Sequence, residues 1–208
     1  RRASRTIYYA GYHELAYLHP SRFIPDKKVV EEAGIKEGEP YFVLRFSAFR
    51  AHHDIGMKGL DTEKKLSLVR LLTNYGKVMI TSEAEIEPEL EPYKMKIPPS
   101  KIHSLLYYAK LFVGDSQTMT SEAAILGTPA IRCNTFTGKI SYLKELEENY
   151  GLVYSYTPEN FGLLINKINE LIANDELKEE WREKKERMLK EKINVTDFMI
   201  WFVENFPI

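Results

Sequence analysis

The stretch LFVGDSQTMTSEAAILGTPAIR, residues 111–132, decides the fold. An apolar run ends in Asp115 and Ser116, a hydroxyl-rich segment with helical spacing follows, and Leu-Gly-Thr-Pro leads into a second apolar run. Gly127 is suited to ending the helix, because glycine readily adopts the left-handed conformation. We therefore expect a strand, a helix and a second strand, in which the helical crossover makes the two strands parallel.

The same alternation continues on both sides of this unit. Patterns that predict strands occupy residues 41–46, 77–81, 93–97, 111–114, 129–134 and 152–156. Helical patterns occupy residues 61–76, 98–109, 117–126, 141–151, 158–174, 175–192 and 195–206. We predict an α/β fold: a Rossmann-like, doubly wound parallel sheet of five or six strands in the order 3-2-1-4-5-6, with helices on both faces.

The composition narrows the function. The chain has 208 residues, of which 28% are charged, and a formal net charge of −1. Nucleic-acid binding is not expected, because phosphate contacts need a clustered basic excess. The single cysteine, Cys133, excludes an intrachain disulfide and is expected to be buried and unreactive. With no signal peptide and no apolar run of about 18 residues, we expect a cytoplasmic protein without a membrane span.

The predicted strand order places two loops, after Phe46 and after Gly114, at the switch point where open α/β sheets bind ligands. At the second loop, unpaired backbone N–H groups and the hydroxyls of Ser116 and Thr118 could bind a phosphate. Glu122 lies about 5 Å further along the helix on the same face and could accept the hydroxyls of a ribose. The alternative is that the hydroxyls cap the helix and Glu122 is solvated.

The loop after the first strand carries further candidates. Arg45 and Arg50 could neutralise a phosphate, because the guanidinium presents a fork of donors. His53 and Asp54 could form an oriented catalytic base, and hydrogen bonding within the loop is the alternative. We expect no metal at His52, His53 and Asp54, since adjacent histidines rarely converge on one ion.

His103 lies on a predicted helix together with Tyr107. His103 could be a structural residue whose ring is hydrogen-bonded within the protein, or it could contact a ligand. The first residues are rich in tyrosine, and an aromatic segment of this kind is expected to cover an interdomain surface.

Two resemblances follow from these residues. DSQTMTSEAAILGTPAIR resembles a pattern in the C-terminal domain of UDP-N-acetylglucosamine 2-epimerases, which have the GT-B glycosyltransferase fold. GYHELAYLHP, LLYYAKLFVGDSQTMTSEAAILGTPAIR and WFVEN more closely resemble a prokaryotic family called domain of unknown function 354, which is grouped with GT-B enzymes. The resemblance covers nearly the whole chain and implies the C-terminal half of a GT-B fold, with an N-terminal Rossmann-like domain missing.

The epimerase pattern implies roles for individual residues. Ser116 would meet the diphosphate and Glu122 would hold the ribose. Gln117 and Thr118 stand where the pattern has two glycines, and this departure alters the expected phosphate geometry, since glycines let a backbone approach phosphate closely. In many GT-B proteins the loop before the predicted helix at 98–109 touches the base, which would place His103 near the nucleobase.

The resemblance also implies a domain division. Residues 1–39 would be an N-terminal segment and interdomain linker with a short helix, residues 40–193 the Rossmann-like nucleotide-binding domain, and residues 194–208 a terminal crossover helix. In GT-B proteins the final helix crosses back to the other domain, and in this chain its apolar residues are expected either to fold onto the sheet or to form an oligomer contact, such as that of a homodimer.

The expected function is that of the C-terminal nucleotide-sugar-binding domain of a GT-B-type glycosyltransferase or sugar-nucleotide epimerase. A UDP-sugar or similar nucleotide would be the substrate, and no separate cofactor is implied. By itself this half would be inactive. The alternative is a non-catalytic binding or scaffold module that keeps the fold.

Overall fold

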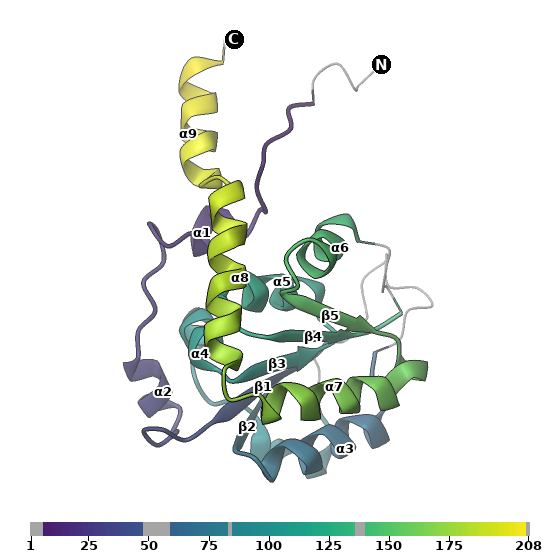
Figure 1. Cartoon of the computed structure of the whole chain (residues 1–208). Helices are drawn as coiled ribbons and strands as arrows, with labels where there is room; N and C mark the ends of the chain where they lie inside the picture. The colour runs from purple at the N-terminus through teal and green to yellow at the C-terminus, as the bar shows by residue number, and fades with distance from the viewer. Residues whose placement is uncertain (1–5, 48–58, 83–84, 136–139, 207–208) are drawn as a thin grey trace.

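The sheet of this protein has five parallel strands in the order β2-β1-β3-β4-β5 (Figure 1). The computed structural model describes residues 6–47, 59–82, 85–135 and 140–206. The strands are β1 Tyr41–Phe46, β2 Lys77–Ser82, β3 Leu111–Gly114, β4 Ala130–Cys133 and β5 Val153–Tyr156. The predicted Rossmann-like parallel sheet is therefore confirmed, with β1 and β3 as neighbours at the switch point.

The sixth predicted strand, at residues 93–97, is wrong. These residues follow a 3-10 helix, η3 (Pro88–Tyr93), and join the sheet through a single bridge from Lys94 to Ile80 on β2. Tyr93 still belongs to η3, so the chain becomes extended only at Lys94 and pairs with β2 over one bridge, in which Met95 donates its backbone N–H to the Ile80 carbonyl at 2.8 Å. The bridge still lies beside β2, where the predicted strand order placed the third strand.

Helices cover both faces of the sheet, with α4, α5 and α6 on one face and α3 and α7 on the other (Figure 1). The helices are α1 Leu15–Leu18, α2 Lys28–Glu32, α3 Thr62–Thr73, α4 Ile102–Tyr108, α5 Gln117–Leu126, α6 Ser141–Glu148, α7 Phe161–Ala173, α8 Leu177–Glu191 and α9 Val195–Asn205. Two further 3-10 helices, η4 Pro99–Lys101 and η5 Pro158–Asn160, precede α4 and α7.

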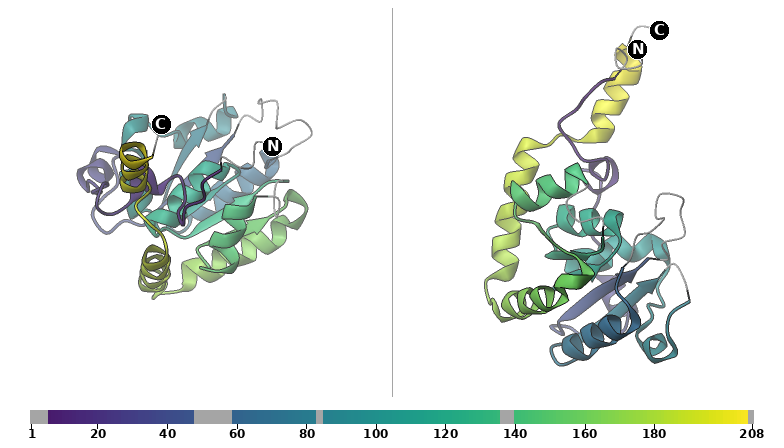
Figure 2. Two further views of the ribbon diagram at one scale, coloured as in Figure 1. Left: turned by 90° about the horizontal axis from the view of Figure 1, so that it is seen from above. Right: turned by 90° about the vertical axis from the view of Figure 1, so that its right-hand side faces the viewer.

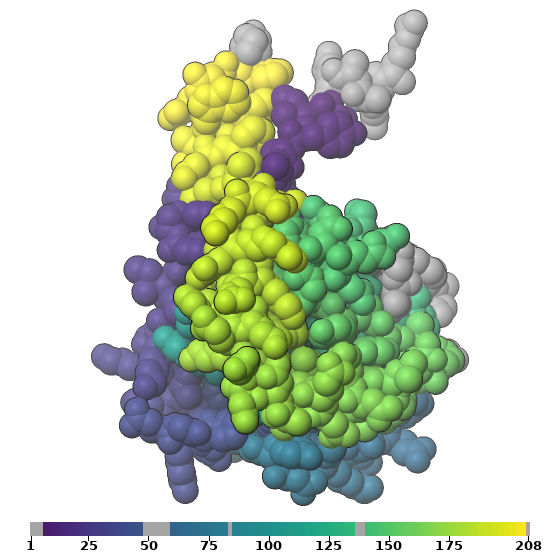
Figure 3. All heavy atoms as spheres, viewed as in Figure 1, coloured from purple at the N-terminus to yellow at the C-terminus, as the bar shows by residue number. Residues whose placement is uncertain are grey.

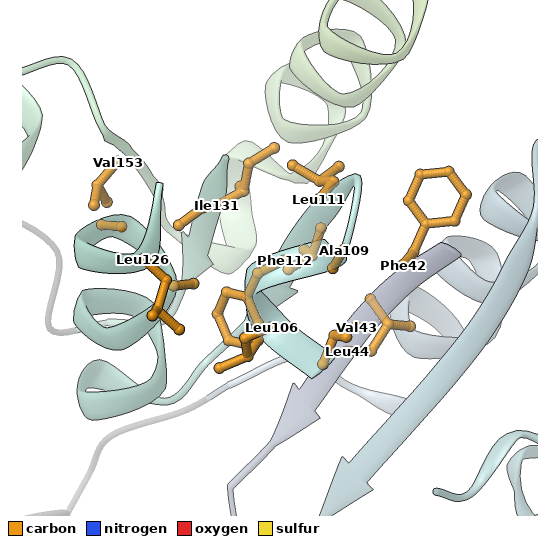
Figure 4. Close-up of a cluster of buried hydrophobic side chains, with 14 of the residues drawn as sticks. Phe42, Val43, Leu44, Leu106, Ala109, Leu111, Phe112, Leu126, Ile131 and Val153 are labelled. Atoms are coloured by element: carbon orange, nitrogen blue, oxygen red, sulfur yellow. The ribbon is translucent and has the colours of Figure 1, made fainter. Parts of the chain in front are cut away.

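The core lies on both sides of the central strands, which explains why their sequences are almost continuously apolar. All four residues of β3 and of β4 are buried. Figure 4 shows part of this core, in which apolar side chains of β1, β3 and β4 meet those of α4 and α5; the labelled residues are Phe42, Val43, Leu44, Leu106, Ala109, Leu111, Phe112, Leu126, Ile131 and Val153.

Residues 6–39 run along one side of the molecule and join it through two short helices. In this N-terminal segment, α1 packs against α5 and α9, and α2 packs against α4. Leu15 and Leu18 of α1 are buried, so this helix is part of the hydrophobic core. The middle turn of α5 is consequently covered by α1.

Helix α9 projects away from the sheet, and the described start of the chain runs beside it (Figures 2 and 3). Its exposed apolar side chains are Met199, Ile200, Trp201 and Val203. The expectation that these apolar residues fold onto the sheet is therefore wrong, because α9 leaves the body of the protein before it could reach the sheet. A contact of this face with a second copy stays a prediction. Among the described residues, no helix has the length and apolar character needed to cross a membrane.

Candidate functional site

The start of α5 lies at the carboxyl end of β3 and is accessible. Ser116 is the N-cap residue, and its Oγ accepts a hydrogen bond from the backbone N–H of Met119 at 3.4 Å. Thr118 is exposed, and Ser116 and Gln117 are half-buried. The first backbone N–H groups of a helix have no partner within it and carry partial positive charge. The arrangement can therefore bind an anion, and Ser116 also has the capping role given as the alternative.

Asp115 joins the ends of three strands directly before this helix. Its Oδ1 accepts the backbone N–H of Ser47 at 2.7 Å, and Asn134 donates from Nδ2 to the Asp115 carbonyl at 2.6 Å. Only 3% of Asp115 is exposed, and burial raises the pKa of its carboxyl to about 6. Asp115 thus fixes the backbone around the switch point, a role that sequence reasoning missed although the apolar strand visibly ends in an acid.

Glu122 is 8% exposed and faces the N-terminal segment, not bulk water. Its Oε1 accepts a hydrogen bond from the hydroxyl of Tyr17 at 2.9 Å and lies 3.0 Å from Nε2 of His103. The rings of Tyr17 and His103 are 5.6 Å apart. The structure therefore brings His103 and Glu122 together, and it shows that Glu122 is not the solvated residue of the alternative interpretation.

A second acid of the N-terminal segment contacts the same turn of α5. Glu14 is 7% exposed, and its Oε1 accepts a hydrogen bond from Oγ of Ser121. Sequence reasoning missed both Glu14 and Tyr17. The available signal was their spacing, since residues three apart in a helical turn lie on one side of it.

Arg45 lies at the switch point, but its hydrogen bond to a neighbouring side chain points away from α5. Its backbone pairs with Gly114, whereas its Nη1 donates to Oγ1 of Thr81 on β2 at 2.9 Å. Because β2 and β3 flank β1 on opposite sides, this hydrogen bond is not directed at Ser116. A phosphate contact of Arg45 stays a proposal.

Three predicted residues, Arg50, His53 and Asp54, lie outside the described residues. Within the described part of the chain, no group of three or more His, Cys, Asp or Glu residues is placed to hold a metal ion. Cys133 is fully buried, and burial raises the pKa of its thiol to about 12, which keeps it protonated and unreactive, as expected.

The fold places the chain in a known class. The parallel sheet, its helices and the loop at the β1–β3 switch point form the Rossmann-like half of a GT-B glycosyltransferase-like fold. The chain belongs to the family described as Protein of unknown function (DUF354), whose profile matches residues 4–205. No curated protein sequence matches the chain.

Solved structures with a similar fold include glycosyltransferases and a wall teichoic acid polymerase. SnogD from Streptomyces nogalater matches with a TM-score of 0.55 and 12% identity, covering 88% of this chain and 46% of its own. VinC, solved in complex with dTDP, matches with a TM-score of 0.54 and 15% identity, and the match covers 80% of this chain and 41% of VinC. The wall teichoic acid polymerase TagF matches with a TM-score of 0.52 and 10% identity, and the match covers 94% of this chain and 51% of TagF. The chain thus spans about half the length of these proteins.

Proposed function

We propose that this chain is the nucleotide-sugar-binding half of a GT-B-type glycosyltransferase. The observation that carries the proposal is the accessible start of α5 at the switch point, where Ser116, Gln117 and Thr118 surround unpaired backbone N–H groups. The fold likeness to VinC, whose structure contains dTDP, supports a nucleoside diphosphate as the ligand.

The diphosphate would bind at the first turn of α5. Exposed Thr118 can add a hydroxyl donor to the backbone N–H groups of that turn. The Asp115 carboxyl lies directly before this turn, and its charge is partly offset because its Oδ1 accepts the Ser47 N–H. Gln117 and Thr118 carry side chains where the epimerase pattern has glycines, so the phosphate would contact side chains as well as backbone.

The ribose would bind at Glu122, whose carboxylate can accept two hydroxyl protons. His103 would stay on Oε1 and hold the carboxylate in place, which makes it a positioning residue. A nucleobase beyond the ribose would lie toward η4 and the start of α4. This arrangement requires the hydroxyl of Tyr17 to leave Glu122.

The bond between the anomeric carbon and the diphosphate oxygen would break while the acceptor oxygen bonds to that carbon. The negative charge that develops on the departing diphosphate would be stabilised by the start of α5. A base would take the acceptor proton, and His53 with Asp54 remains our proposal for it. UDP-sugars are the proposed donors, and the acceptor-binding part would lie on a further domain.

A non-catalytic module is the second candidate, and one observation favours it. Gln117 and Thr118 fill the first turn of α5 with side chains where a close backbone approach to phosphate would need glycine. Such a module would bind nucleotide without hydrolysing or transferring the sugar. Product analysis of the full-length protein with labelled nucleotide sugars would separate this candidate from the enzyme.

Calorimetric titration of the full-length protein with UDP, CDP, dTDP and their sugar derivatives tests the proposal. We expect one nucleotide to bind and Glu122→Gln to weaken it about tenfold or more, as for a lost hydrogen bond to a charged group. Glu183→Gln, on the exposed face of α8, is the matched control and should leave the Kd unchanged. Failure of every nucleotide to bind the wild-type protein would contradict the proposal.

A further inference from the structure

Tyr17 supplies to Glu122 the same hydrogen bond that a ribose hydroxyl would supply. Its phenolic O–H donates to Oε1 at 2.9 Å, and burial together with the neighbouring Glu122 charge raises the pKa of the phenol, so it stays a donor. Oε1 of Glu122 accepts the Tyr17 hydroxyl and also lies 3.0 Å from Nε2 of His103, and only 8% of Glu122 is exposed, so a ribose hydroxyl would reach Oε1 in place of Tyr17. The two donors, phenol and ribose, therefore compete for one acceptor.

The displacement of Tyr17 does not require the core to open. Tyr17 is 39% exposed, whereas Leu15 and Leu18 on the same short helix are buried and anchor it. The Tyr17 ring packs against the ring of His103, and the His103 ring also lies 6.1 Å from the ring of Phe23. A rotation of the Tyr17 side chain toward solvent would expose Glu122 while His103 keeps its hydrogen bond.

The segment that carries Tyr17 is tied to α9. The hydroxyl of Thr196 donates to the carbonyl of Ala16, Asn194 donates from Nδ2 to Oγ of Ser21 at 2.9 Å, and Arg22 forms an ion pair with Asp197. These contacts hold the backbone on both sides of Tyr17 in place, so the displacement of Tyr17 is confined to its side chain.

We propose that Tyr17 is a built-in competitor for the ribose-binding carboxylate, so that it lowers nucleotide affinity. The inference rests on the proposed function of Glu122. It assigns to Tyr17 an inhibitory contact, which a purely structural tyrosine would not have.

The test is calorimetric titration of wild-type and Tyr17→Phe full-length protein with UDP and dTDP. Phenylalanine keeps the ring and removes the donor, so we expect the Kd to fall about three- to tenfold, in the range of the net contribution of one ordinary hydrogen bond. Tyr75→Phe, a half-exposed tyrosine at the far end of α3, is the matched control and should leave the Kd unchanged.

The same substitution in a Glu122→Gln background completes a double-mutant cycle. In that background Tyr17→Phe should no longer lower the Kd, because the carboxylate for which Tyr17 and the ribose compete has been removed. A Kd that is unchanged or raised in Tyr17→Phe, or a gain that persists in the Glu122→Gln background, overturns the inference while leaving the proposed function intact. Absence of nucleotide binding in all four proteins overturns both.

Discussion

Gly114 on β3 lies so close to Arg45 on β1 that a Cβ atom at position 114 would stand 2.7 Å from the Arg45 carbonyl oxygen. The two residues are register partners at the switch point, and Asp115 donates its backbone N–H to the same oxygen at 3.2 Å. The lack of a side chain at position 114 therefore lets β1 and β3 approach directly beneath the candidate site.

Gly114→Ala should destabilise the protein by about 1–3 kcal/mol, as for an overpacked core position. Gly162→Ala is the matched control, because a Cβ at this position in α7 meets nothing within 4 Å and alanine favours the helix. Urea unfolding should show a lower free energy of unfolding for Gly114→Ala and a free energy of unfolding raised by up to about 1 kcal/mol for Gly162→Ala. Equal effects would contradict the close-approach account.

Asp115 should make stability depend on pH. Its carboxyl has a folded-state pKa of about 6, above the ordinary value of 3.8, because of burial. The folded protein then binds the proton more tightly than the unfolded chain, so the contribution is fully present below about pH 4 and is lost as pH rises through about 6. The free energy of unfolding should fall by up to about 3 kcal/mol over this pH range.

Asp115→Asn keeps an oxygen for the Ser47 N–H and removes the titration. The free energy of unfolding of this variant, minus that of the wild type, should be larger at about pH 8 than at about pH 4. Urea unfolding at both pH values measures this difference. Asp175→Asn, at an exposed position between α7 and α8, should show no such gain. A difference between wild type and the Asp115→Asn variant that is the same at both pH values would argue against a raised pKa.

Gly127 ends α5 with φ of +85°, and a Cβ there would lie 2.8 Å from Cδ of Lys185, whose Nζ donates to the Leu126 carbonyl at 3.0 Å. Gly127→Ala should therefore cost about 1–2 kcal/mol for the left-handed backbone, plus the displacement of Lys185. Gly151→Ala carries the same backbone strain at φ +63° without a contact closer than 3.7 Å. Thermal unfolding should show the larger loss for Gly127→Ala, and the opposite order would refute the role of Lys185.

The sheet could be predicted because each strand is a short apolar run bounded by helical periodicity. The strand prediction at 93–97 failed because the short alternating pattern does not reveal that the preceding 3-10 helix extends to Tyr93. The Ser116 cap and the helix of Glu122 follow from local sequence. The partners of Glu122 do not, because Tyr17 is 105 residues away and its position depends on how α1 packs on α5.

The accessible start of α5 as a diphosphate site is the central claim. It is tested most directly by following the backbone amide resonances of ¹⁵N-labelled protein during titration with UDP and dTDP. The amides of Gln117, Thr118 and Met119 should shift with one shared Kd, while that of Gly162 in α7 should stay fixed. Saturable binding that leaves the three α5 amides unmoved would contradict the claim.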